Sequence, residues 1–279
     1  KFPYIKIITT PQTRALAELT LHNSVSILKK EIEEDDFEFY SHDEVDLLIK
    51  MIEYKEYQNE FELNSYHQQK DAKVNCTFYD AGHILGSAGI LLENNNYKIF
   101  YTGDINLSSQ TLQPTAQLPE TKIDTLILET TYGATDSNLL LDWDSESQRF
   151  AKEANNILNN GGSILIPVFS LGKTQEMLGT IWKLMLKRKL TTVDIYTGGL
   201  GTKINRTYDY NRFVVNRIDS EFELNTIPQN NYYEISNSEE FFKHPCIVLA
   251  SSGMMIKGTA SCITSHEDGL GKKILQSFQ

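Results

Sequence analysis

The chain has 279 residues, 40% of them hydrophobic and 23% charged, which is normal for one large or two ordinary globular domains. Its formal net charge of −11 argues against a protein that coats nucleic acid by bulk electrostatics, but allows an enzyme that holds a phosphodiester through metal ions. No apolar run approaches the roughly 20 residues of a membrane-spanning helix, so no membrane partner is expected. No signal pattern opens the chain, and Cys76, Cys246 and Cys262 lack paired spacing, which predicts reduced thiols in a cytoplasmic protein.

The first 134 residues predict a mixed and antiparallel sheet with helices outside it. We expect a strand over 4–9 and a helix over 14–32, where apolar residues recur at helical spacing. Ser41-His42-Asp43-Glu44 is a capping-box pattern that predicts the start of a second helix.

Further strands are predicted over 74–79, 89–92 and 97–101, the last two joined across an Asn-rich turn. A short buried strand is predicted over 125–128, directly before Glu129.

The pattern then changes to alternating strands and helices, which predicts a parallel sheet covered on both faces. In chain order we expect a helix over 145–160, a strand over 163–168, a helix over 172–189, and strands over 193–196 and 246–250.

His83 and Asp104 are the strongest candidates for chemistry. Each follows an apolar strand and lies beside glycine, in Ala81-Gly82-His83-Ile84-Leu85-Gly86-Ser87 and in Thr102-Gly103-Asp104. Imidazole nitrogens and carboxylate oxygens are the usual ligands of a hydrolytic zinc, and an aspartate can bridge two cations. The two residues therefore predict half of a metal site. The other five histidines have no such setting and are interpreted as structural.

Glu129 leaves two readings open. It is either a turn or capping carboxylate, or an acid that orients a metal ligand or the attacking water.

Two turns rich in small residues, here called corners, follow predicted strands, and their backbone amides could bind the phosphates of a nucleic-acid backbone. In the first, Ser170, Gly172 and Lys173 precede a helix, but Pro167 stands where a nucleotide-binding P-loop needs glycine, so nucleotide hydrolysis is excluded there. Ser252 and Gly253 form the second corner.

Together these segments resemble the metallo-β-lactamase superfamily, in its β-CASP branch, and within it the RNA-processing nucleases related to cleavage and polyadenylation factors. The segments that carry the likeness are Thr9–Thr13, Ala81–Ala88, Thr102–Asp104, Glu129–Gly133, the Pro-x-Phe-x-x-Gly-x-x-Gln-Glu-like Pro167–Glu176, Ser251–Met255 and Glu267–Leu275.

The resemblance implies an α/β fold, an αββα metallo-β-lactamase sandwich (1–134 and 264–279) with an inserted β-CASP domain (135–263) whose parallel sheet is flanked by helices. It implies a ribonuclease with two zinc ions. His83 and Asp104 would be metal ligands, with Asp104 and Glu129 catalytic. Ser170, Gly172, Lys173, Ser252 and Gly253 would contact RNA, which enters a groove between the domains as a single strand. A homodimer is compatible with this assignment.

The sequence also departs from the family. No His-x-His-x-Asp-His motif occurs, and this motif supplies most zinc ligands in the family. An active enzyme therefore requires the motif elsewhere in the full-length protein. The alternatives are a catalytically inactive scaffold paralogue and a DNA-directed nuclease of the same branch; a small-molecule lactamase fits poorly, because it would lack the 135–260 insertion.

Overall fold

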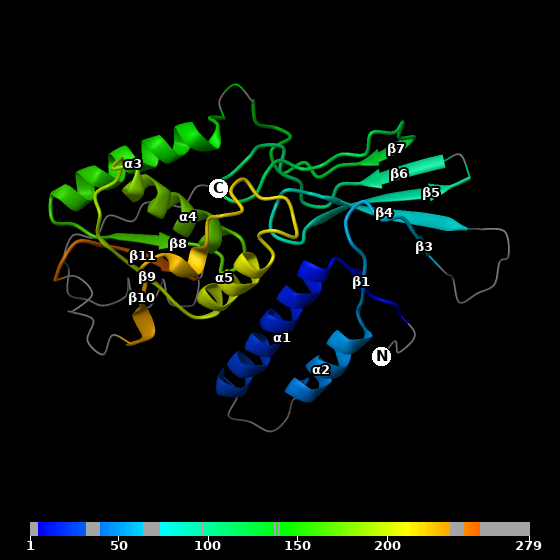
Figure 1. Cartoon of the computed structure of the whole chain (residues 1–279), viewed down its shortest axis with the longest axis horizontal. Helices are drawn as coiled ribbons and strands as arrows, with labels where there is room; N and C mark the ends of the chain where they lie inside the picture. Colours follow the sequence, from blue (N-terminus) through cyan, green and yellow to red (C-terminus); the bar gives the residue numbers. More distant parts are fainter. Residues whose placement is uncertain are drawn as a thin grey trace. The chain divides into compact units, whose positions relative to one another are not determined.

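The computed structural model divides the chain into two compact units (Figure 1). Unit 1 comprises Lys1–Ser109 and Pro114–Leu139, and unit 2 comprises Gln110–Gln113 and Leu140–Gln279. The boundary between the two units lies after Leu139, whereas the sequence predicts a domain boundary after residue 134. The assignment of these units to named domains stays a prediction. The structure describes residues 5–31, 40–63, 73–95, 97–136, 138, 140–234 and 243–251.

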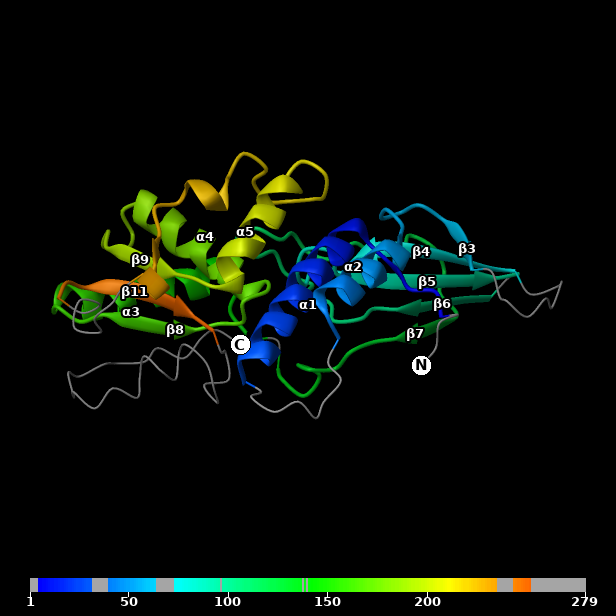
Figure 2. The ribbon, with the colours of Figure 1, turned by 90° about the horizontal axis from the view of Figure 1, so that it is seen from below.

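Unit 1 is built on a five-stranded sheet of order β3-β4-β5-β6-β7 (Figure 2). The strands pair antiparallel except for β6 and β7, which run parallel. This arrangement confirms the mixed sheet expected from the sequence. The bounds are β3 Phe61–Leu63, β4 Val74–Asp80, β5 Ala88–Asn94, β6 Tyr97–Tyr101 and β7 Thr125–Ile127.

The predicted burial of the last strand is wrong. Side chains at its end are about half exposed, because β7 is the edge strand and pairs only with β6 among the described strands. The exposed fractions are 57% for Leu126, 49% for Ile127 and 50% for Leu128.

Two helices of unit 1, α1 (Pro11–Glu31) and α2 (His42–Met51), pack side by side in both ribbon views (Figures 1 and 2). Their contact is an apolar cluster of Val25, Val45, Ile49 and Ile52. The predicted capping box is confirmed, since Ser41 Oγ accepts the Glu44 amide while the Glu44 carboxylate accepts the Ser41 amide. Of the strand expected over 4–9, residue 4 lies outside the described residues, and within 5–9 only β1 (Ile8–Thr9) is a strand. It pairs in parallel with β2 (Glu53–Tyr54).

Unit 2 contains a four-stranded parallel sheet of order β10-β9-β11-β8, as the alternating pattern predicts. Every residue of β8 (Ile164–Pro167) and β11 (Cys246–Ala250) is buried, as expected for strands covered on both faces. The other strands are β9 (Asp194–Thr197) and β10 (Asn230–Asn231), and the helices are α3 (Trp143–Asn159), α4 (Lys173–Leu186) and α5 (Leu200–Tyr210), with short 3-10 turns η2 (Leu224–Thr226) and η3 (Tyr232–Glu234).

Within the described part of the chain, no helix has the length and apolarity required to cross a bilayer.

Candidate functional site

Strand direction brings three candidate residues of unit 1 to one edge of its sheet, here meaning the side on which β4, β6 and β7 all end. β4, β6 and β7 run the same way, because β4 and β6 are each antiparallel to β5, and β7 is parallel to β6. His83, Asp104 and Glu129 follow the carboxyl ends of β4, β6 and β7 in that order. Residues that follow equally directed strands lie at the same edge, so the three side chains share one end of the sheet.

The His83 loop is held by side chains from its own ends. Ser87 Oγ accepts the backbone amides of His83 at 3.2 Å and of Ile84 at 3.3 Å. At the start of the loop, Asp80 Oδ1 accepts the Gly82 amide at 2.9 Å, and burial raises the pKa of the Asp80 carboxyl. These contacts give the half-buried His83 a defined backbone position.

The start of α1 supports the same loop. The hydroxyls of Thr10 and Thr13 both donate to the Gly86 carbonyl, at 2.9 and 2.7 Å. Gly86 has φ +85°, and a Cβ there would lie 2.7 Å from the Thr13 nitrogen. Only glycine combines this backbone conformation with so close an approach.

Glu129 is tied to the turn that carries Asp104. Its carboxylate accepts the amide of Ile105, the residue after Asp104, at 3.3 Å, and the amide of Thr131 at 2.9 Å. Hydrogen bonds from Thr131 are the main reason that the Glu129 pKa is lowered, with smaller contributions from Ile105 and from the proximity of His83. Glu129 is thus an ionised carboxylate beside both candidate ligands, and Asp104 itself is exposed.

The chemistry of these donors fits zinc, but the donor set is partial. Imidazole and carboxylate are zinc ligands, and a catalytic zinc commonly has three protein ligands. The ligand atoms of His83, Asp104 and Glu129 do not gather within 4.8 Å of one another, as a three-residue metal group in the described residues would. At this end of the sheet His83 and Asp104 offer two donors of zinc-ligand type among the described residues, and their role as metal ligands stays a prediction.

The first phosphate corner lies at the start of α4, in unit 2. Gly172, with φ +82°, donates its amide to the side chain of Gln175 at 2.8 Å, so this donor is already engaged. Lys173 Nζ donates to Gln110 Oε1 at 3.3 Å and lies 5.7 Å from the centroid of the Trp143 ring, and burial lowers its pKa. Ser170 is half-buried. Phosphate contacts by these residues stay predictions.

The second corner, Ser252 and Gly253, lies outside the described residues.

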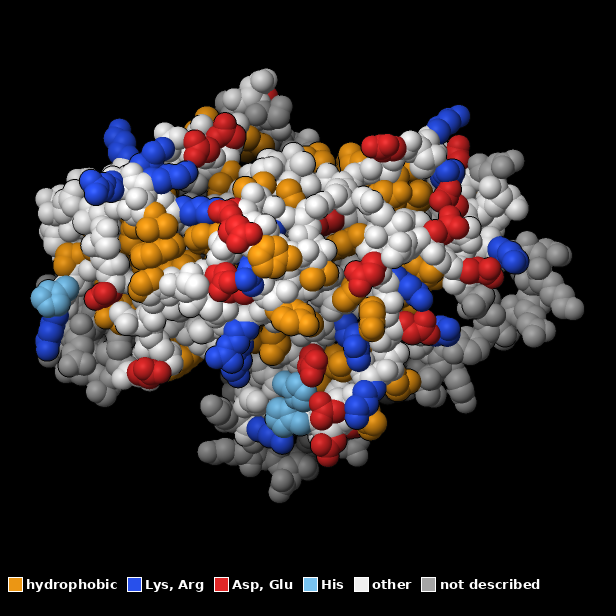
Figure 3. Space-filling view, viewed as in Figure 1, with side chains coloured by type: hydrophobic (Ala, Val, Ile, Leu, Met, Phe, Trp, Pro, Cys, Tyr) orange, Lys and Arg blue, Asp and Glu red, His pale blue; other side chains and the backbone are white. Residues whose placement is uncertain are grey.

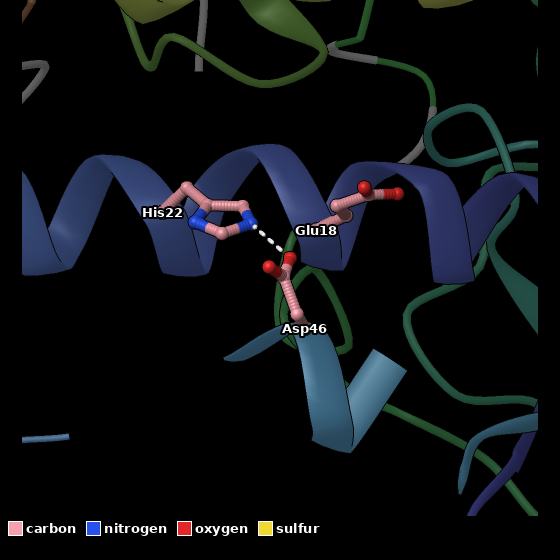
Figure 4. Close-up of side chains that lie close together, drawn as sticks. All are labelled: Glu18, His22 and Asp46. Carbon is pink, nitrogen blue, oxygen red and sulfur yellow. Dashed lines mark hydrogen bonds and ion pairs between the residues drawn. The ribbon is translucent and has the colours of Figure 1, made fainter. Parts of the chain in front are cut away.

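Sequence reasoning missed a group of metal-ligand type on α1 and α2. One ligand atom each from Glu18, His22 and Asp46 lie within 4.8 Å of one another (Figure 4). The sequence alone indicates structural roles for His22 and His42, because they lie on or beside predicted helices. The signal that could have found the group is the spacing of four between Glu18 and His22, and between His42 and Asp46.

Comparison with known proteins finds relatives whose names agree with one another, although no family model matches the chain. An RNase J-like protein of Methanocaldococcus jannaschii is 32% identical over all of this chain and 62% of its own length. Cleavage and polyadenylation specificity factor subunit 3 of Dictyostelium discoideum is 29% identical over 91% of this chain and 32% of its own length. Cleavage and polyadenylation specificity factor 73 of Drosophila melanogaster is 32% identical over 70% of this chain and 29% of its own length.

These relatives carry the names of RNA-processing proteins, one of them an RNase J-like protein. They support the resemblance of this chain to the β-CASP branch of the metallo-β-lactamase superfamily. The chain spans less than two thirds of the length of each relative described here.

Proposed function

We propose that the chain is part of a zinc-dependent ribonuclease that hydrolyses RNA phosphodiester bonds. The observation that carries the proposal is the placement of His83, Asp104 and Glu129 after three equally directed strands of one sheet. The names of the relatives, which include an RNase J-like protein, support the same activity. In this proposal residues 1–134 and 264–279 form an αββα metallo-β-lactamase sandwich, and residues 135–263 form an inserted β-CASP domain.

Each residue of the sheet edge has a separate task. His83 would hold one of two zinc ions, and Asp104 would bridge both. The zinc pair, when bound, supplies an activated water and offsets charge on the attacking and leaving oxygens. Glu129 holds the Asp104 turn through the Ile105 amide, and its ionised carboxylate lies where it can orient a ligand or the attacking water. The proposal requires at least one more ligand from the full-length protein.

The proposed substrate is single-stranded RNA, held through its backbone phosphates by Ser170, Gly172, Lys173, Ser252 and Gly253. In this proposal a phosphate replaces Gln175 as the acceptor of the Gly172 amide and Gln110 as the acceptor of Lys173. A net charge of −11 leaves little general attraction for RNA, so binding has to rely on such local contacts and on the metal ions.

The experiment measures cleavage of an end-labelled single-stranded RNA by the full-length protein with zinc. We expect Asp104→Asn and His83→Ala to lower the rate by more than about 100-fold, since even residues that only orient a metal ligand are worth about 10–100-fold. The matched control is His244→Ala, which changes an exposed histidine of unit 2.

Cleavage that is unchanged in Asp104→Asn would overturn the assignment. A wild-type protein that binds no zinc and cuts no RNA would establish the scaffold alternative, and cleavage of single-stranded DNA alone would establish the DNA-directed one.

A further inference from the structure

The two helices of unit 1 face one another with paired side chains of metal-ligand type. Glu18 and His22 lie one turn apart on α1, and His42 and Asp46 lie one turn apart on α2. Residues at this spacing project from the same face of a helix. Figure 3 shows histidine side chains beside acidic ones on the surface over α1 and α2, so the group is accessible to an ion from solution.

His22 contacts a different partner with each ring nitrogen. Its Nε2 lies 3.1 Å from Asp46 Oδ1, and its Nδ1 lies 2.7 Å from Nδ1 of His42, whose ring stacks on it at 5.0 Å between centroids. Glu18 lies next to this pair, and one of its carboxylate oxygens belongs to the three ligand atoms that lie within 4.8 Å of one another (Figure 4). One imidazole and two carboxylates are therefore close enough to share an ion.

The contact with His42 suits a metal-binding histidine. When the His22 proton lies on Nδ1, it is donated to His42, and the lone pair of Nε2 faces the carboxylate of Asp46, with a Glu18 oxygen nearby. A lone pair and two anionic groups repel unless a cation lies among them. Metal-ligating histidines commonly donate their second ring nitrogen in this way, which sets the tautomer and orients the ring.

The backbone beneath the group is well supported. The apolar cluster of Val25, Val45, Ile49 and Ile52 joins the two helices, and the Ser41–Glu44 capping box defines the start of α2 next to His42. Only side-chain adjustment is then needed to bring three ligand atoms, already within 4.8 Å of one another, onto one ion.

We propose that Glu18, His22 and Asp46 bind a divalent transition-metal ion of the zinc class, with His42 as the residue that positions His22. One nitrogen and two carboxylate oxygens, with water completing the shell, suit zinc. The site is separate from the sheet edge of His83 and Asp104. Bound metal would join α1 to α2, and α1 in turn supports the His83 loop through Thr13, together with Thr10 just before the helix.

The test counts zinc bound to the full-length protein by equilibrium dialysis, after removal of metal with a chelator. We expect His22→Gln and Asp46→Asn each to lose one zinc equivalent relative to wild type, and His244→Gln, the matched histidine control, to lose none. Asp46 is 53% exposed, so its variant is not expected to disturb the fold, which circular dichroism checks.

A second measurement separates ligands from the positioning residue. His42→Phe should keep the stoichiometry but weaken zinc binding at this site by about 10–100-fold. Cobalt loaded in place of zinc should give an absorption band that is lost in His22→Gln and kept in Asp104→Asn.

Equal zinc counts for wild type, His22→Gln and Asp46→Asn would overturn the proposal. The group would then be a hydrogen-bonded chain in which His22 Nε2 donates to Asp46 and His42 donates to His22. Because no readout uses RNA cleavage, this failure is distinct from failure of the proposed function.

Discussion

The carboxylate of Glu176 accepts a hydrogen bond from the backbone amide of Leu112 at 2.9 Å. The same carboxylate accepts the amides of Thr111 and Gln113, also at 2.9 Å. Residues Gln110–Gln113 belong to unit 2, although the chain on either side of them belongs to unit 1. One buried side chain of α4 thus holds a short segment of distant sequence in unit 2.

Glu176→Ala is expected to destabilise unit 2 strongly, because three backbone amides lose their acceptor. Each buried donor left unpaired costs about 1–3 kcal/mol. Urea unfolding followed by tryptophan fluorescence measures the change, since Trp143 Nε1 donates to Thr111 in this segment. Glu153→Ala, an exposed carboxylate on α3, is the control and should change stability by less than about 0.5 kcal/mol. A Glu176→Ala protein as stable as this control would contradict the assigned role.

Gly86→Ala should lower the free energy of unfolding by more than the cost of placing alanine at a positive φ, and should increase the mobility of the His83 loop. A non-glycine residue at positive φ costs about 1–2 kcal/mol, and overlap with the Thr13 nitrogen adds about 1–3 kcal/mol. Gly161→Ala is the control, because Gly161 has φ +80° with nothing within 4 Å of a Cβ. Thermal unfolding and hydrogen exchange of residues 81–90 measure the difference. Equal costs at both positions would show that the contact with α1 does not constrain the loop.

Ser41→Ala should destabilise α2 by about 1 kcal/mol, because the Glu44 amide loses its acceptor. Ser41→Gly is the matched comparison and should cost only a few tenths of a kcal/mol. Hydrogen exchange of α2 amides reports both. If the α2 amides of the Ser41→Ala protein exchange as slowly as those of wild type, the Ser41 hydroxyl does not stabilise the helix.

Cys76 and Cys246 should resist thiol reagents in the folded protein. Burial raises the pKa of Cys76 to about 11 and also raises that of Cys246, so little thiolate forms near pH 8. The sequence has three cysteines, so a Cys262→Ser variant retains only the thiols of Cys76 and Cys246. Alkylation of both should be slow without denaturant and complete in urea. Rapid alkylation of the folded protein would show that one of them is accessible.

Local patterns in the sequence predicted most elements, because their causes are local. The capping box before α2 and the Asn turn between β5 and β6, where Asn95 has φ +51°, depend only on neighbouring residues. Helix α1 begins at Pro11, earlier than the periodicity indicated, because the first turn of a helix tolerates proline and need not be apolar.

Properties that depend on distant partners were harder to predict. The apolar composition of β7 suggested burial, but its edge position follows from pairing with β6 alone. The grouping of His83 with Asp104 could be inferred from motifs, whereas its physical basis is the common direction of β4 and β6. The meeting of His22 with His42 depends on how α1 packs on α2, which neither helix shows by itself.

Because Gln110–Gln113 belong to unit 2, cutting the chain between the units does not separate them cleanly. A nick in the chain between Leu139 and Leu140 would release an amino-terminal fragment that still contains Gln110–Gln113, and a carboxyl-terminal fragment that still contains Glu176. The second fragment, expressed alone, would lack a piece of its own interior that includes the buried Leu112. Complementation by the first fragment, rather than independent folding, is the behaviour to expect.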